Sequence, residues 1–189
     1  MTFLRGRDAP RTGRLARRVS SFDDRVTAQI ELARSPGADH LFYSLSSAAD
    51  HGLLWLSIGA VRAATSRHHR RAFVRLAVAM GAESVLTNGV IKTAFRRIRP
   101  PEYFDEGPLP YGMHRPITSA FPSGHAASAF TAATLLADDD PLAPAYYGLA
   151  ALVAASRVYV RMHHASDVVA GAAWGLALGR LIRRTFPLD

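Results

Sequence analysis

Two cations near the middle of the chain could bind a phosphate group. Lys92 and Arg99 are seven positions apart, directly after an apolar stretch. If the helix of that stretch continues through Ile98, seven residues make about two turns, so both cations lie on one face. A lysine ammonium and a planar arginine fork together suit the oxygens of a phosphate. Arg96 and Arg97 fall on other faces, where we expect contact with solvent or lipid headgroups.

The stretch FPSGHAASAF, residues 121–130, predicts a helix N-terminus that can bind an anion. Ser123 is a favoured N-cap after a proline, and Gly124 permits close approach of the backbone to a ligand. The free N–H groups of the first turn and the serine hydroxyl can bond phosphate oxygens. His125 lies beside them and could protonate a leaving group. An ordinary capped helix with an incidental histidine is the alternative for this stretch taken alone.

The stretch SRVYVRMHHASD, residues 156–167, contains a candidate nucleophile. His163 and Asp167 are four positions apart and can be in contact on a helix or at its start. A carboxylate that holds one imidazole nitrogen leaves the other free to attack an electrophile. His164 is the rival nucleophile, but it points about 100° away. The alternative is a His–Asp pair that only caps the last helix. Arg157 adds a third cation.

Composition excludes several classes of protein. The 189 residues are 49% hydrophobic with a formal charge of +8, which is incompatible with a disordered chain and fits one domain with a full core. The absence of cysteine excludes disulfide frameworks, thiol catalysis and iron–sulfur ligation. We expect no metal site and no cofactor, because His68 and His69 lie in a basic loop and His114 has no partner at ligand spacing.

The elements that must position these residues are helices. The apolar residues fall into five blocks rich in Ala, Gly and Leu, near 42–65, 72–92, 123–138, 142–160 and 166–184. We expect an all-α fold, a multi-span transmembrane bundle of about five spans, with a soluble helical protein as the alternative. A glycine every fourth residue gives the last block a smooth face for close packing (Gly171, Gly175, Gly179). Charged residues inside the blocks should face inward and pair (Arg62, Arg75, Glu83).

Residues 1–40 differ from the rest of the chain. Six arginines between positions 5 and 18 face a single acid, which predicts a mobile basic arm. The pattern from Ser21 to Arg34 predicts an amphipathic surface helix capped by Ser21. We therefore divide the chain into residues 1–40, the arm and this helix, and residues 41–189, the membrane-embedded domain. Nucleic-acid binding is not expected, because only the arm has charge of that kind.

The three stretches together resemble the signature of the type 2 phosphatidic acid phosphatase superfamily. That signature is Lys, six residues, Arg-Pro; then Pro-Ser-Gly-His; then Ser-Arg, five residues, His, three residues, Asp. All eleven fixed positions are matched, by Lys92, Arg99, Pro100, Pro122, Ser123, Gly124, His125, Ser156, Arg157, His163 and Asp167. The resemblance extends from about residue 42 to 184 and leaves the arm outside.

The resemblance implies an integral-membrane phosphatase that needs no metal. It implies that five residues hold the phosphate (Lys92, Arg99, Ser123, Gly124, Arg157). His163 would attack phosphorus to form a phosphohistidine, Asp167 would orient it, and His125 would protonate the leaving oxygen before water releases phosphate. The implied substrates are lipid phosphates: phosphatidic acid, phosphatidylglycerol phosphate, a polyprenyl diphosphate or a polyprenyl sugar phosphate. Membrane lipids are the other expected partners.

Three alternatives remain for the activity. Vanadium haloperoxidases and glucose-6-phosphatase have a similar signature, so haloperoxidase-like chemistry or a soluble phosphate ester is an alternative, although 189 residues leave no room for the added helical domain of haloperoxidases. The third is a non-catalytic membrane adaptor.

Charge distribution predicts an orientation in the membrane. With five spans, the arm and the three motifs share one side, which carries fifteen Lys and Arg residues against six on the other. The positive-inside rule then places the active site at the cytoplasmic face of the cell membrane.

Overall fold

The protein is helical throughout the part that the structure describes. The computed structural model describes residues 13–100, 118–138 and 140–188, and these contain no strand. The long helices are α1 (Arg14–Leu32), α2 (Pro36–Ala48), α3 (Leu53–Ala63), α4 (Arg67–Ser84), α6 (Gly124–Leu136), α7 (Ala143–Tyr159) and α8 (Ala165–Thr185). Three shorter elements are also present: a 3-10 turn η1 (Asp50–Gly52), a π-helical segment η2 (Val85–Ile91) and the short α5 (Lys92–Ala94). The predicted all-α class is confirmed.

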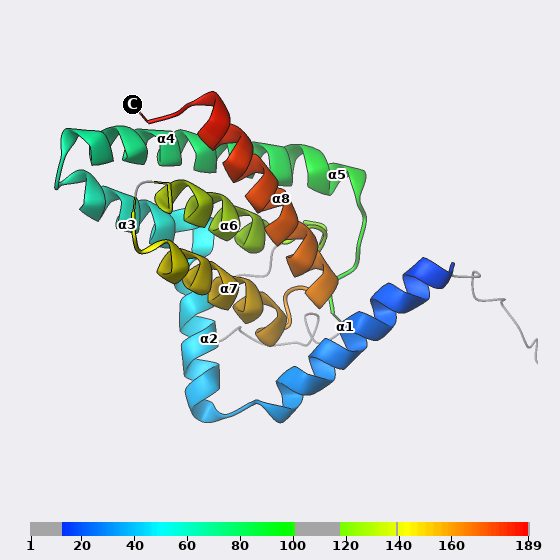
Figure 1. The fold of residues 1–189 in the computed structure, drawn as a ribbon. Helices are drawn as coiled ribbons and strands as arrows, with labels where there is room; N and C mark the ends of the chain where they lie inside the picture. The colour runs from blue at the N-terminus through cyan, green and yellow to red at the C-terminus, as the bar shows by residue number, and fades with distance from the viewer. Residues whose placement is uncertain (1–12, 101–117, 139, 189) are drawn as a thin grey trace, which may run out of the picture.

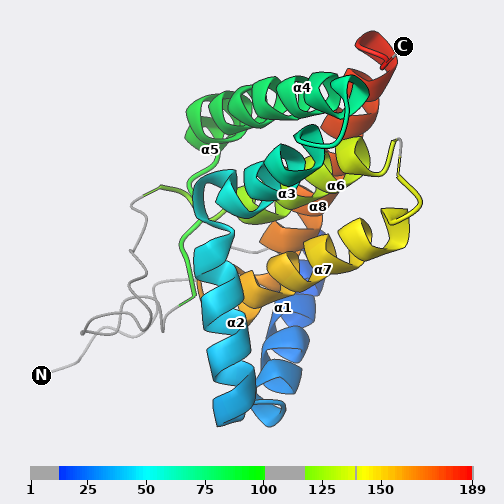
Figure 2. The ribbon, with the colours of Figure 1, turned by 90° about the vertical axis from the view of Figure 1, so that its left-hand side faces the viewer.

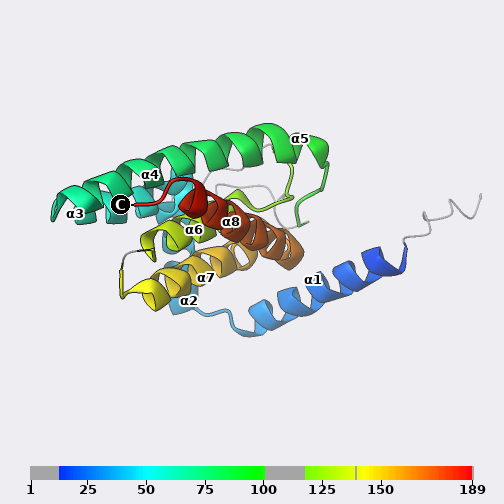
Figure 3. The same ribbon diagram turned by 45° about the horizontal axis from the view of Figure 1, so that its top comes forward.

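Helix α6 is the centre of the fold and positions the site. It is surrounded by α4, α7 and α8 (Figures 1 and 3). Its small side chains let α8 pack very close, and a Cβ placed on Gly175 would collide with the carbonyl group of Ala127. Gly171 and Gly179 meet α6 in the same way. The glycine face predicted for the last apolar block therefore faces α6 and fixes the distance between the two helices.

The first predicted block, residues 42–65, is two helices rather than one. It breaks at η1, where His51 (φ 54°) and Gly52 (φ 73°) adopt left-handed conformations. A side chain at Gly52 would be strained and would also clash with Met80. Ser35 is the N-cap of α2, and its hydroxyl accepts a hydrogen bond from the Ala38 N–H.

Helix α1 begins earlier than predicted. It starts at Arg14, so Ser21 is an interior residue that accepts a hydrogen bond from Arg25 rather than an N-cap. Arginine has a good helix propensity, and the last residue upstream that breaks a helix is Gly13. The end of the predicted arm is thus helical, and residues 1–12 lie outside the described part of the chain. Helices α1 and α2 lie together below the other helices (Figure 2).

The interior arginines are paired, as expected, at the end of the bundle remote from the start of α6. Arg75 donates to Asp138 at 2.8 Å, Arg62 lies 3.2 Å from Asp140, and the two carboxylates follow the last turn of α6. Arg183 of α8 also reaches Asp138, at 3.3 Å. These ion pairs tie α3, α4 and α8 to the end of α6. Glu83 is buried in a different place, beside the cavity described below.

Two described helices are long and apolar enough to cross a membrane. They are Arg67–Ala94, which joins α4, η2 and α5, and Ala165–Thr185. Helix α3, with 11 residues, and α6, with 13, are about 16 and 20 Å long against a hydrocarbon core of about 30 Å. The count of about five spans therefore stays a prediction.

Candidate active site

The predicted site residues converge on one cavity of about 470 Å³. It lies among η1, α4, η2, the first turn of α6 and the end of α7. Six of the eight predicted residues line it (Lys92, Arg99, Gly124, His125, Arg157 and His163). Ser123 and Asp167 lie directly behind the wall with side chains fully buried. The three separate sequence motifs thus form one site.

Both Lys92 and Arg99 line the cavity, but the backbone between them differs from the prediction. The helix ends at Ala94 and Phe95 is extended, so Arg99 lies on a non-helical segment rather than on the same helix face as Lys92. Two carbonyl groups hold its guanidinium: Nη1 donates to Met162 O at 2.6 Å and Nη2 to Thr118 O at 3.2 Å. The extended segment, and not helical periodicity, brings the two cations together.

Arg157 supplies the third positive charge from the last turn of α7. Its side chain is 2% exposed, and its guanidinium donates to the Ser46 hydroxyl on α2 and to the sulfur of Met162. The side chain lines the cavity, where its positive charge can attract an anion.

The start of α6 has the predicted anion-binding geometry. Ser123 is the N-cap, with its hydroxyl accepting from the Ala126 N–H at 3.5 Å, and its own N–H donates to the backbone carbonyl of Asp167 at 3.0 Å. A Cβ on Gly124 would lie 3.7 Å from Lys92 Nζ and 3.5 Å from Asn88 Oδ1. The glycine therefore leaves open the space beside the lysine ammonium that a phosphate would occupy.

His163 is held in one tautomer by a backbone carbonyl. Its Nδ1 lies 2.7 Å from Ala120 O, and because a carbonyl can only accept, the neutral ring carries its proton on Nδ1. The lone pair of Nε2 then faces Arg99 Nη1, which donates to it at 3.5 Å. Burial, and after it the charges of Arg157, Arg99 and Lys92, hold the pKa of His163 well below its usual value. The imidazole is therefore neutral and can act as a nucleophile at Nε2.

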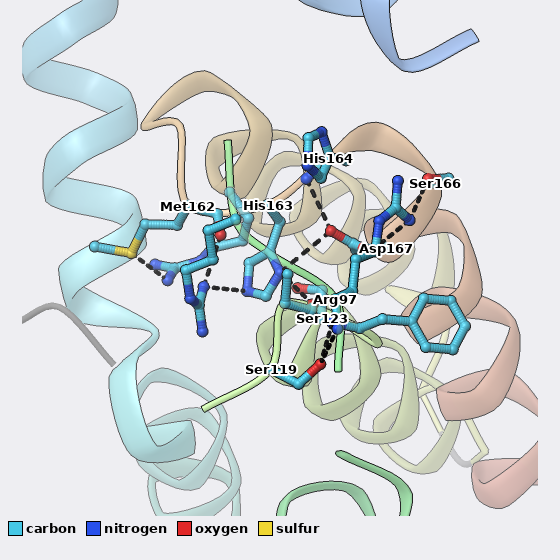
Figure 4. A network of polar contacts seen from close by, with 12 residues as sticks. Arg97, Ser119, Ser123, Met162, His163, His164, Ser166 and Asp167 are labelled. Carbon is cyan, nitrogen blue, oxygen red and sulfur yellow. Dashed lines mark hydrogen bonds and ion pairs between the residues drawn. The ribbon is translucent and has the colours of Figure 1, made fainter. Parts of the chain in front are cut away.

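Asp167 lies farther from His163 than a hydrogen-bonded pair would. Its Oδ2 is 3.9 Å from His163 Nδ1 and accepts a bond from the backbone N–H of His164 at 2.9 Å (Figure 4). This bond belongs to a capping box at the start of α8. Asp167 is thus both the expected neighbour of His163 and the helix-capping residue of the alternative interpretation. His164 does not line the cavity.

Arg97 was expected to contact solvent or headgroups but is part of a partly buried network. Its Nη1 donates to Asp167 at 2.7 Å and to the Ser166 hydroxyl at 2.7 Å (Figure 4). Its Nη2 donates to Asp23 at 2.6 Å. Asp23 also accepts from the Ser166 N–H at 2.8 Å. No sequence spacing relates residues 23, 97 and 167, so only the fold shows that α1 supports the loop that carries His163.

Asp50 is a second functional candidate that sequence reasoning missed. His125 Nε2 lies 2.8 Å from Asp50 Oδ1, and both residues line the cavity. Partial burial opposes ionisation of Asp50, but the hydrogen bond from His125 and the charge of Arg157 lower its pKa overall. An ionised carboxylate favours the protonated form of the histidine beside it. The residues Asp50-His51-Gly52 could have indicated a turn, but the sequence analysis predicted one helix over 42–65.

The cavity is suited to an anion. Its three cations and the free N–H groups of α6 converge on one space. Among residues 13–100, 118–138 and 140–188, no three His, Cys, Asp or Glu side chains are grouped so that they could hold a metal.

Comparisons with known proteins point to one family. Residues 72–188 match the PAP2 superfamily. A decaprenylphosphoryl-5-phosphoribose phosphatase of Mycobacterium tuberculosis (strain CDC 1551 / Oshkosh) is 32% identical over 158 residues, which are 83% of this chain and 85% of that protein. The crystal structure of Aquifex aeolicus LpxE has a TM-score of 0.69 at 26% identity and covers 85% of this chain and 93% of its own.

A second solved structure is similar over much of its length. The transmembrane PAP2-type phosphatidylglycerolphosphate phosphatase of Bacillus subtilis has a TM-score of 0.68 at 25% identity and covers 93% of this chain and 87% of its own. The chain therefore belongs to the PAP2 superfamily and is a lipid phosphatase.

Proposed function

We propose that the protein hydrolyses a phosphate ester on a membrane lipid through a phosphohistidine at His163. The observation that carries this proposal is the state of that imidazole. Its Nδ1 is bonded to the Ala120 carbonyl, and its Nε2 lone pair faces the cavity cations. A neutral, oriented histidine beside fixed positive charge is the arrangement that nucleophilic attack on a phosphate dianion needs.

The reaction has two steps. In the first, His163 Nε2 attacks phosphorus while the bond from phosphorus to the leaving oxygen breaks, and that oxygen takes a proton from His125. In the second, a water oxygen attacks phosphorus, its proton passes to His125, and the phosphorus–nitrogen bond breaks to release phosphate. Lys92, Arg99 and Arg157, with Ser123 and the Gly124 N–H, stabilise the charge on the phosphoryl oxygens. Asp167 acts as a positioning residue, and no metal or cofactor takes part.

The first substrate to test is a lipid-linked sugar phosphate. The mycobacterial relative is named for such a substrate, decaprenylphosphoryl-5-phosphoribose. Phosphatidic acid, phosphatidylglycerol phosphate and a polyprenyl diphosphate complete the panel, because phosphate-binding groups alone do not select among them.

We also propose how the chain sits in the cell membrane. Residues 41–189 form the embedded domain with about five spans, and α1 lies on the surface with its apolar side on the bundle. The active site and residues 1–40 face the cytoplasm, because the cations are concentrated on that side. Support comes from α1, which packs at the site end through Asp23 and Arg97. Protease protection of an N-terminal tag in sealed inside-out vesicles would contradict the cytoplasmic placement.

The activity is tested by phosphate release from the detergent-purified protein in EDTA across this panel. We expect release that is insensitive to EDTA and absent in His163→Ala. His164→Ala is the matched control, since that residue is adjacent but does not line the cavity. Release that persists in His163→Ala, or is lost only in His164→Ala, would contradict the assigned nucleophile.

A further inference from the structure

The cavity has a wall of hydrogen-bonding side chains that the phosphate chemistry does not use. Glu83, Ser84 and Asn88, here called the acceptor wall, line it from α4 and η2. We propose that the acceptor wall binds hydroxyl groups on the part of the substrate next to the phosphate, so that the substrate carries its phosphate on a sugar or glycerol unit. The proposal rests on the proposed function and specifies its substrate class.

Glu83 is the residue that most needs a ligand. Its side chain is 3% exposed and lies in the middle of a helix long enough to cross a membrane. The Thr87 hydroxyl bonds the carboxylate, but Oε1 is buried without a hydrogen-bond partner among the described residues. A buried carboxylate oxygen without a donor is unfavourable, and ionisable groups inside membrane helices are usually functional. A donor on a bound substrate would complete its hydrogen bonding.

Asn88 joins the acceptor wall to the phosphate site. Its Nδ2 donates to the Ser84 hydroxyl at 3.3 Å, so its Oδ1 is left to accept from another group. That oxygen lies near Gly124, as does the ammonium of Lys92. Lys92, Asn88 and Ser84 follow one another along a continuous helix that includes the π segment. A unit attached to a phosphate at Lys92 therefore lies against Asn88 first and Glu83 next.

Charge in the cavity favours hydroxyl groups over other donors. Three cations line this space against two carboxylates, so a headgroup ammonium is disfavoured there (Lys92, Arg99 and Arg157; Asp50 and Glu83). A purely apolar group, such as the acylglycerol of phosphatidic acid, would cover Glu83 without giving it a donor. A hydroxyl group donates a hydrogen bond without adding charge. His125 lines the same cavity, so the leaving oxygen and the hydroxyl-bearing unit occupy connected space.

The test compares substrates that differ only in hydroxyl groups. One pair is a short-chain prenylphosphoryl-5-phosphoribose and its 2,3-dideoxy analogue. The other is phosphatidylglycerol phosphate and an analogue in which propane-1,3-diol replaces the glycerol headgroup. We would measure kcat/KM for each in detergent with the wild-type protein, Glu83→Met, Glu83→Gln and Asn88→Ala. Glu31→Gln is the matched control, because Glu31 lies on α1 outside the cavity.

The wild-type protein should prefer the hydroxylated member of at least one pair by about 10-fold or more, as expected where a buried polar group would otherwise lack a hydrogen bond. Glu83→Met should reduce that preference to less than about 3-fold by slowing only the hydroxylated substrate, and Glu83→Gln should give an intermediate value. Glu31→Gln should keep the full preference. If Glu83→Met does not fold, Glu83→Gln and Asn88→Ala still provide the comparison.

Equal rates for both members of each pair, or an equal loss on both in Glu83→Met, would overturn the acceptor wall. The proposed function would survive that result as long as release depends on His163. If no release depends on His163, the proposed function fails instead. The acceptor wall is then judged by calorimetric binding of the same pairs to His163→Ala, where tighter binding of the hydroxylated member supports it and equal binding overturns it.

Discussion

Replacing Asp50 by asparagine should slow the enzyme only when the leaving group needs a proton. Asp50 Oδ1 lies 2.8 Å from His125 Nε2, and the pair lies near Arg157 in the same cavity. Burial and the nearby cations disfavour a protonated His125, and the Asp50 carboxylate opposes them, so its loss should make a proton on His125 less available for transfer. Asparagine keeps the size and one hydrogen bond but removes the charge.

The size of the effect follows from the partial exposure of Asp50. A hydrogen bond between charged partners contributes about 1.5–3 kcal/mol when buried. The Asp50 side chain is 38% exposed, so solvent screens part of this charge. We therefore expect a loss of about 1–2 kcal/mol, which corresponds to a decrease in kcat of about 5- to 30-fold on a lipid phosphate with an alkyl leaving group.

The assay compares two leaving groups in the same variant. p-Nitrophenolate departs without protonation, so Asp50→Asn should lower kcat on p-nitrophenyl phosphate by less than about 2-fold, whereas the alkyl ester should show the full loss. Asp24→Asn, an exposed acid on α1, is the matched control and should behave as the wild-type protein. An equal loss on both substrates would refute the role of Asp50 in proton transfer and indicate a structural effect.

Three further predictions concern the support of the site. Arg97→Gln breaks the ion pairs with Asp23 and Asp167 and should lower both the melting temperature and kcat, with KM little changed; wild-type values of both would contradict the network. Gly175→Ala should destabilise the fold by about 1–3 kcal/mol in a denaturant titration because of the clash with Ala127, whereas Gly148→Ala, in open space, should not. The lowered pKa of His163 keeps its nucleophile neutral, so kcat/KM should begin to fall only as the pH drops below about 6.5; an acidic limb centred at higher pH would contradict that assignment.

Local sequence signals predicted the parts of the site that depend on local backbone. The start of α6 is an example, because Pro122 ends one segment and Ser123 caps the next whatever surrounds them. The glycine face of α8 was similarly visible, since it depends only on spacing within one helix. The prediction that Lys92 and Arg99 lie close together is correct, but the reason given for it is wrong. It assumed a helix through Ile98, whereas the helix ends at Ala94.

Long-range contacts could not be predicted from one sequence. The carbonyl of Ala120 holds Nδ1 of His163, but a backbone carbonyl has no residue type to recognise. The bond from Arg97 to Asp23 joins residues 74 positions apart, and many arginines in this basic chain are equally plausible partners from sequence alone. Asp50 was hidden because a left-handed turn interrupts an otherwise apolar stretch.

The central claim is that His163 becomes covalently phosphorylated, and trapping the intermediate tests it most directly. The purified protein in EDTA would be mixed with a ³²P-labelled lipid phosphate that it hydrolyses, quenched in alkali within milliseconds, digested and sequenced by mass spectrometry. Phosphohistidine is stable in alkali and labile in acid, so a label with that behaviour on His163, absent in His163→Ala and present in His164→Ala, is the expected result. Turnover with no label on His163 under any quench time, or a label on His164 instead, would contradict it.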